Sequence, residues 1–178
     1  MDQDLRYPIG RFRRPADVTA AERAVFIEAI AATPAALREA VRGLADPQLD
    51  TPYRPDGWTV RQVVHHVPDS HVNAYVRLKL ALTEVEPTIK PYDEAKWAAL
   101  PDSRSALVAE SLALLDALHT RWVFLLRSMT PADFSRTLVH PEHPGSPMTL
   151  DVLLAMYAWH GRHHVAHITA LRERMGWP

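Results

Sequence analysis

The chain has 178 residues, of which 47% are hydrophobic and 23% are charged, and its formal net charge is −1. This balance excludes the basic surface of a nucleic-acid-binding protein, and no apolar run approaches the roughly 20 residues of a membrane span. The absence of cysteine excludes disulfides, a thiolate nucleophile and thiolate metal ligands. We therefore expect one cytoplasmic domain over residues 1–178, with no apolar signal region at its start.

Residues 1–18 are rich in arginine and proline and show no hydrophobic periodicity. They predict an extended arm that lies over the surface of the protein. The segment "RYPIGRFRRP" within this arm either wraps its own subunit or straps a second one in a dimer.

The first helix is predicted to begin after Thr19, because Thr19 and Glu22 have the spacing of a capping box. Val25 lies on the predicted apolar side of this helix, together with Ala29 and Ala32. The pair Thr33-Pro34 is expected to interrupt it, with a second segment running to about Leu44.

Residues 46–57 are rich in turn-forming residues and predict a loop. Thr59 and Gln62 form a second capping-box pattern, so a helix should run from there to about Thr83. A long connection with room for one short helical turn precedes a third long helix over residues 103–129. That helix has apolar residues at helical spacing, namely Leu107, Leu114, Leu118 and Leu125.

Residues 140–148 form a proline-rich loop in which His140 and His143 should be exposed. Thr149 then caps a last helix that ends near Gly176. No segment alternates between apolar and polar residues, so no sheet is expected. Four long amphipathic helices in one domain predict an all-α four-helix bundle with long connections and an extended N-terminal arm.

The last helix holds four of the ten histidines of the chain within eight positions. His160 and His164 lie on or at the edge of its core face, His167 lies beside that face, and His163 lies further out. Two imidazoles at i and i+4 share one helix face and can bind one metal ion. The core face itself is defined by Leu153, Tyr157, Ile168, Leu171 and Met175.

The second long helix contributes "VVHHVPDSH", in which His66 belongs to a polar stripe beside the apolar face. Such a stripe is typical of the wall of a bundle cavity, although an ordinary solvated face has the same pattern. His65 lies opposite the apolar face and should be solvated, whereas His71 lies nearer the core. The stripe comprises Gln62, His66, Ser70, Asn73 and Arg77.

These segments resemble the DinB/YfiT superfamily, and within it the YfiT-like branch. The resemblance extends almost end to end and includes "YPIGRF", "LDTPYRPDGWTVRQVVHHVPDSH", "PYDEAKW", "LHTRWVFLLRSM", "YAWHGRHHVAHI" and "RMGWP". It implies a homodimeric four-helix bundle with one divalent metal per subunit, bound by His66, His160 and His164. Pro68 departs from the pattern of the branch, in which alanine is expected, and would either shift His66 or bend its helix.

Three imidazoles leave an open position for water or substrate, and they suit zinc first and nickel as the alternative. Such an ion can activate water for hydrolysis or a thiol for group transfer. The resemblance implies both reactions, because the branch is described as metal-dependent hydrolases and the wider superfamily resembles S-transferases that use bacillithiol or mycothiol.

Metallohydrolases usually pair the ion with a carboxylate base, yet Gly161 and Arg162 lie between the two histidines of the last helix. Asp69, the acid nearest His66, turns away from the apolar face. We therefore predict a metal-dependent thiol S-transferase that uses a small bacillithiol-like thiol against electrophiles in detoxification. The alternatives are a metal-dependent hydrolase with Asp69 as base, and a non-catalytic, stress-related metal or small-molecule binding protein.

Four further side chains are candidates for the reaction or for cosubstrate binding. Asp69 and Arg162 are the candidate catalytic groups. Asn73 and Arg77, together with Arg162, are candidates for contact with an anionic cosubstrate. The expected partners are a small-molecule thiol and an electrophile, with neither nucleic acid nor membrane.

Overall fold

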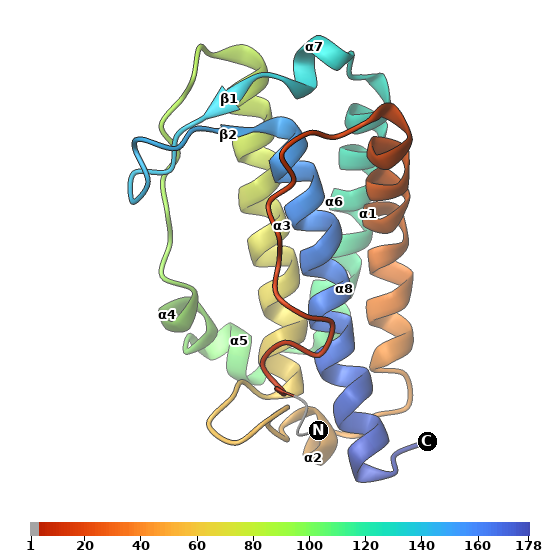
Figure 1. Ribbon diagram of the computed structural model, residues 1–178. Helices are drawn as coiled ribbons and strands as arrows, with labels where there is room; N and C mark the ends of the chain where they lie inside the picture. The colour runs from red at the N-terminus through yellow and green to blue at the C-terminus, as the bar shows by residue number, and fades with distance from the viewer. Residues whose placement is uncertain (1–3) are drawn as a thin grey trace.

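The computed structural model describes residues 4–178 and places four long helices side by side (Figure 1). They are α1 (Ala20–Ala40), α3 (Val60–Thr83), α6 (Val108–Ser128) and α8 (Leu150–Met175). Short helices lie in the connections, namely α2 (Asp46–Leu49), α4 (Glu94–Ala98), α5 (Pro101–Ser105) and α7 (Pro131–Phe134). The predicted four-helix bundle is confirmed, and none of the described helices is both long and apolar enough to cross a membrane.

The long connections determine which helices become neighbours. α1 packs against α6 and α8, and α3 packs against the same two helices, so α1 and α3 occupy opposite corners of the bundle. Figure 1 shows α3 and α6 running upwards while α1 and α8 run downwards. The connection after α3 therefore returns from the top of the bundle to the bottom, where its helices α4 and α5 pack against α3 (Figure 1).

The ends of the long helices follow the predicted capping chemistry. The Thr19 side chain accepts from the Glu22 backbone N–H, and the Glu22 carboxylate accepts from the Thr19 N–H, as in a capping box. Thr59 and Gln62 repeat this arrangement at the start of α3. α8 ends at Gly176, whose φ of 62° is the left-handed conformation that glycine adopts without strain.

The predicted break of the first helix at Thr33-Pro34 is wrong, because α1 continues through Pro34 to Ala40. A proline inside a helix leaves the carbonyl four residues earlier without its donor. Here that carbonyl belongs to Ile30, and the Nδ1 atom of His119 on α6 donates to it at 2.7 Å. A contact between helices thus replaces the missing backbone bond.

The predicted third helix over residues 103–129 is also wrong in its first part, because the chain is extended at Ala106 and Leu107 between α5 and α6. The buried Arg61 side chain donates to the Ala106 carbonyl at 3.1 Å, which holds this carbonyl outside a helix. His65, expected to be solvated, is buried at the same place. Its Nε2 lies 3.3 Å from the Ala106 carbonyl and its Nδ1 lies 2.7 Å from the Ser111 hydroxyl.

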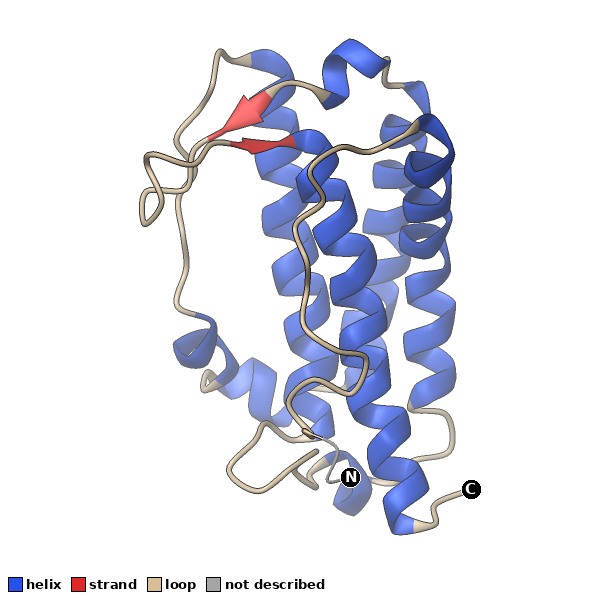
Figure 2. Cartoon of the chain, in the orientation of Figure 1, coloured by secondary structure: helices blue, strands red, loops and turns tan. Residues whose placement is uncertain are grey.

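Three smaller expectations are corrected as well. Thr137–Leu138 (β1) pairs antiparallel with Met148–Thr149 (β2), a ribbon too short to show alternation (Figure 2). The predicted loop over residues 46–57 contains α2. Val25, Leu107 and Leu114 lie at the surface, because the buried faces of α1 and α6 are set by their two neighbours rather than by the apolar stripe that local periodicity selects.

The core consists of two apolar clusters separated by a polar layer. Along every long helix, the residues of one cluster precede those of the other, and buried polar residues lie at or next to the point where the two clusters meet. This layer comprises Thr33, His66, Ser70, His71, His119 and His164. Burial of an imidazole without a hydrogen-bond partner costs free energy of folding. The partners of these histidines therefore bear on both the stability and the chemistry of the layer.

Candidate metal centre

Three histidines from two helices converge at the polar layer. His66 of α3 faces His160 and His164 of α8, and ring-nitrogen atoms of the three residues all lie within 4.8 Å of one another. The Nε2 atoms of His66 and His160 are 3.4 Å apart. Two imidazole nitrogens bound at about 2.0–2.1 Å to one tetrahedral ion would lie about 3.4 Å apart, so this spacing fits a shared ion.

α3 remains continuous through Pro68, two residues after His66. Pro68 was expected either to shift His66 or to bend its helix. The helix does not break at Pro68, and His66 still reaches the other two histidines. Pro68 is itself buried in the helix packing.

The protonation chemistry of the cluster also suits a metal. Burial lowers the pKa of His66 to about 4, with a smaller contribution from His167. Burial first, and neighbouring imidazoles second, lower the pKa of His160 and His164 well below the ordinary value. All three rings are therefore neutral at pH 7, the form that binds a metal. His164 Nδ1 is buried and has no hydrogen-bond partner among residues 4–178.

The cluster opens into a cavity of about 480 Å³. A larger hollow of about 670 Å³ lies between α1 and α6, but the three histidines do not line it. The walls of the smaller cavity come from the N-terminal arm, from the loop that precedes α3, and from helices α3, α4 and α8. They comprise Arg6, Tyr7, Tyr53, Arg54, Asp56, Gly57, Trp58, His66, Glu94, Trp159, His160, His163, His164 and His167.

The N-terminal arm closes one side of this cavity and wraps its own subunit. The indole N–H of Trp159 donates to the Gly10 carbonyl at 3.2 Å, and His167 Nε2 lies 3.1 Å from the Arg6 carbonyl. His163 stacks between Tyr7 and Trp159, with ring centroids 5.9 and 4.2 Å away. In Figure 1 the arm rises along α8 from the bottom of the bundle to the start of α1 at the top. Of the two predicted roles of the arm, the described contacts are those of an intramolecular wrap.

Aromatic rings line the cavity beside the histidines. Trp58 packs against His66 with ring centroids 4.7 Å apart, and Tyr53 stacks on His167 at 4.0 Å. These rings offer an apolar wall to a bound molecule and restrict the access of water to the imidazoles.

Glu94 is the residue that the sequence reasoning missed. It is the first residue of α4 and lines the cavity, so a carboxylate does share the pocket with the three histidines. Glu94 is exposed to solvent along part of its side chain, and partial desolvation of its carboxyl group raises its pKa, with Arg77 acting in the opposite direction. The only signal was its place in "PYDEAKW", a segment distant in sequence from every histidine of the cluster.

The two candidate catalytic groups lie outside this cavity. Asp69 is half-buried, and its burial, followed by the charge of Asp102 on α5, raises its pKa to about 6. Arg162 is exposed, and its Nε donates to the Ala158 carbonyl in its own helix. Neither side chain lines the pocket.

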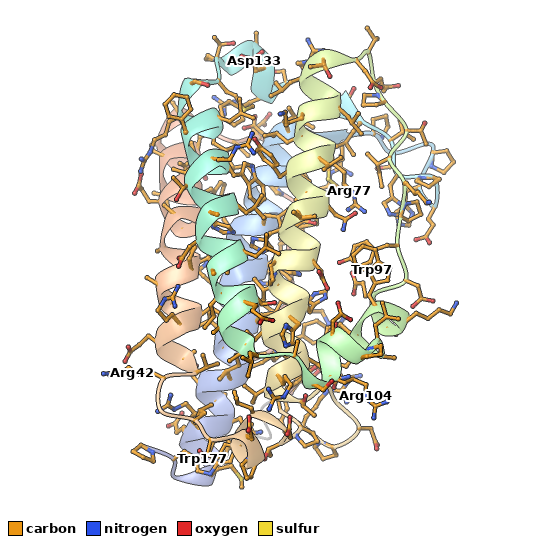
Figure 3. The ribbon with its side chains drawn as sticks, turned by 180° about the vertical axis from the view of Figure 1, so that it is seen from behind. Arg42, Arg77, Trp97, Arg104, Asp133 and Trp177 are labelled. Atoms are coloured by element: carbon orange, nitrogen blue, oxygen red, sulfur yellow. The ribbon has the colours of Figure 1, made fainter. Side chains whose placement is uncertain are left out.

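The two candidate cosubstrate contacts are also not among the lining residues. The Asn73 side chain donates to the Asp69 carbonyl of its own helix. Arg77 points from α3 towards the connection near Trp97, as Figure 3 shows, and donates to the Lys90 carbonyl at 3.3 Å. The arginines that do line the cavity are Arg6 and Arg54.

Comparison with known proteins supplies a second, independent line of information. A family model described as the DinB superfamily matches residues 29–168. A Bacillus mycoides (strain KBAB4) protein named "Putative metal-dependent hydrolase" is 55% identical over 175 residues, covering 98% of this chain and 99% of the relative. A protein of the same name from Bacillus cereus (strain B4264) is 55% identical over 174 residues, with the same coverage.

Among solved structures, YfiT from Bacillus subtilis matches with a TM-score of 0.96 and 48% identity, covering 98% of this chain and 99% of that one. It is described as "a probable metal-dependent hydrolase with an unusual four-helix bundle topology". The two proteins therefore share their fold over 98% of this chain.

Proposed function

The chain belongs to the DinB superfamily, and from this premise we propose that it is a metal-dependent hydrolase of small molecules whose ion is held by His66, His160 and His164. Zinc is the expected ion and nickel the alternative, because both accept neutral imidazole donors. When bound, a divalent cation with an open position polarises a substrate carbonyl and lowers the pKa of water. The names of the close relatives support this reaction class.

The observation that carries hydrolysis is the place of Glu94 in the pocket. Glu94 accepts a proton from the attacking water as the new C–O bond forms at the acyl carbon. It then delivers that proton to the leaving group as the scissile bond breaks. The raised pKa of Glu94 lies closer to neutral pH than that of an ordinary glutamate, which suits a group that must both take and return a proton.

A second candidate reaction uses the same centre for thiol S-transfer, and the two cavity arginines favour it. Arg6 and Arg54 line the pocket and can bind the acidic part of a small bacillithiol-like thiol. The thiol gives its proton to solvent, and its sulfur forms a new C–S bond at an electrophilic carbon. Either the carbon–halogen bond breaks and halide departs, or an epoxide C–O bond breaks and its oxygen takes up a proton from solvent. Because the chain has no cysteine, the thiol must come from a cosubstrate.

The first experiment measures the metal content of tag-free protein by mass spectrometry, comparing wild type with His164→Ala and with the exposed-loop control His143→Ala. About one zinc or nickel per chain that is lost only in His164→Ala supports the centre. Protein that refuses both ions when they are supplied removes the hydrolase and the transferase together.

Glu94→Gln then separates the two reactions in metal-loaded enzyme, with the exposed-loop variant Glu142→Gln as the matched control. Removal of a general base should lower ester or amide hydrolysis at least about 100-fold. Thiol transfer to an aryl halide should be unaffected by Glu94→Gln, while Arg54→Ala raises the KM for the thiol. Metal binding without turnover in either assay would favour the non-catalytic binding protein.

A further inference from the structure

A chain of buried imidazoles connects the proline of α1 to the candidate metal centre. It begins at the Ile30 carbonyl, which Pro34 deprives of its usual backbone donor. His119 Nδ1 lies 2.7 Å from this oxygen. A carbonyl only accepts hydrogen bonds, so Nδ1 of His119 must carry the proton.

The contact between His119 and His71 fixes the position of the ring proton on α3 in turn. His119 Nε2 lies 2.8 Å from His71 Nδ1, and both residues are almost fully buried. Their hydrogen-bond partners are imidazoles and a carbonyl and include no carboxylate, so a charge on either buried ring would be unpaired and both rings are neutral. A neutral His119 with its proton on Nδ1 can only accept at Nε2, and His71 therefore donates from Nδ1.

The last contact reaches α8. His71 Nε2, now without a proton, lies 3.1 Å from His160 Nδ1. His160 must donate there, which leaves a lone pair on its Nε2. That nitrogen lies 3.4 Å from His66 Nε2 and 3.4 Å from the Ser70 hydroxyl. It is thus the nitrogen that faces the rest of the cluster.

We propose that His71 and His119 are positioning residues that hold His160 in the tautomer with its proton on Nδ1 and its lone pair directed at the ion. The tautomer itself follows from metal-free contacts, and only its use rests on the proposed metal centre. Hydrogen bonds behind a ligating histidine fix its ring and its tautomer, and their loss typically costs 10- to 100-fold in metal affinity. The chain is a fixed orienting device rather than a proton conductor, because it ends on an amide carbonyl that cannot take up a proton.

The tautomers can be measured directly in metal-free wild-type protein labelled with ¹⁵N-histidine. Long-range ¹H–¹⁵N correlation spectra should show His119, His71 and His160 protonated on Nδ1. His65 serves as an internal reference of the opposite kind, because its Nε2 faces the Ala106 carbonyl. A His160 proton on Nε2 would overturn the proposal whether or not the protein binds a metal.

Metal affinity provides the second readout, measured for zinc by competition with a chromophoric chelator. His71→Leu should weaken binding by 10- to 100-fold. His65 is another buried histidine of α3, but it does not touch the cluster. His65→Leu should therefore leave the zinc affinity within about twofold of the wild-type value. Equal losses in the two variants would assign His71 to packing alone.

Rescue at His119 separates hydrogen bonding from volume. His119→Gln places a carbonyl near the former Nε2, where it can still accept from His71, whereas His119→Leu cannot. The glutamine variant should therefore recover most of the affinity and the Nδ1 tautomer of His160. If both variants bind zinc equally weakly, the chain does not orient the ligand. Wild-type protein that binds no metal but shows the expected tautomers would refute the metal centre alone.

Discussion

Acid should unfold the metal-free protein at a pH at which most domains remain stable, because its buried histidines must stay neutral. Burial lowers the pKa of His66 and of His119 to about 4. A histidine in the unfolded chain has a pKa near 6.5, so between these two values the unfolded state binds more protons than the folded state. The free energy of unfolding is therefore full above about pH 6.5 and falls as the pH drops towards 4.

The size of the effect follows from these values. At pH 5.5 each of the two histidines lowers the free energy of unfolding by about 1.4 kcal/mol, or about 3 kcal/mol together. His71, His160 and His164 have pKa values lowered well below normal and act in the same direction. The sum is a large part of the 5–15 kcal/mol that is typical of a whole domain.

Urea unfolding followed by circular dichroism between pH 7.5 and pH 5 measures this loss. The exposed-loop variant His143→Gln should follow the wild-type profile, and bound zinc should move the loss to lower pH, since a metal that binds only the folded state stabilises it. A free energy of unfolding that stays constant within about 1 kcal/mol from pH 7.5 to 5.5 in metal-free protein would refute the reasoning.

Three further predictions concern packing around the site. Gly161→Ala should lower the free energy of unfolding by about 1–3 kcal/mol, because a Cβ there would lie 2.5 Å from the Thr33 hydroxyl. Urea unfolding should show that adding Thr33→Ala restores part of this loss. No recovery in the double variant would contradict this contact. Arg61→Met should cost about 2 kcal/mol and lower Tm by several degrees, since its buried guanidinium binds two aspartates; an unchanged Tm would show that these pairs contribute nothing. Trp159→Phe removes the bond to the Gly10 carbonyl, worth about 1 kcal/mol, and should speed tryptic cleavage in the arm about fivefold, whereas an unchanged rate would mean that other contacts hold it.

The sequence alone predicts the number of long helices and most of their ends. Capping at Thr19, Thr59 and Thr149 is a local interaction, as is the left-handed turn at Gly176, so the residues involved are neighbours in the sequence. The i, i+4 spacing of His160 and His164 is equally local. Helical periodicity therefore brings these two imidazoles together before any tertiary contact is known.

Contacts between residues distant in the sequence were decided only by the tertiary structure, because helical periodicity carries no information about them. His65 looks solvated on a helical wheel but is buried because the α5–α6 junction covers it. Glu94 lines the pocket because the connection after α3 returns along the bundle. Helix α1 continues through Pro34 because His119 donates to the Ile30 carbonyl. Each of these contacts joins residues distant in the sequence. Local patterns determine helices, whereas the packing between helices determines which buried polar groups meet and what chemistry they share.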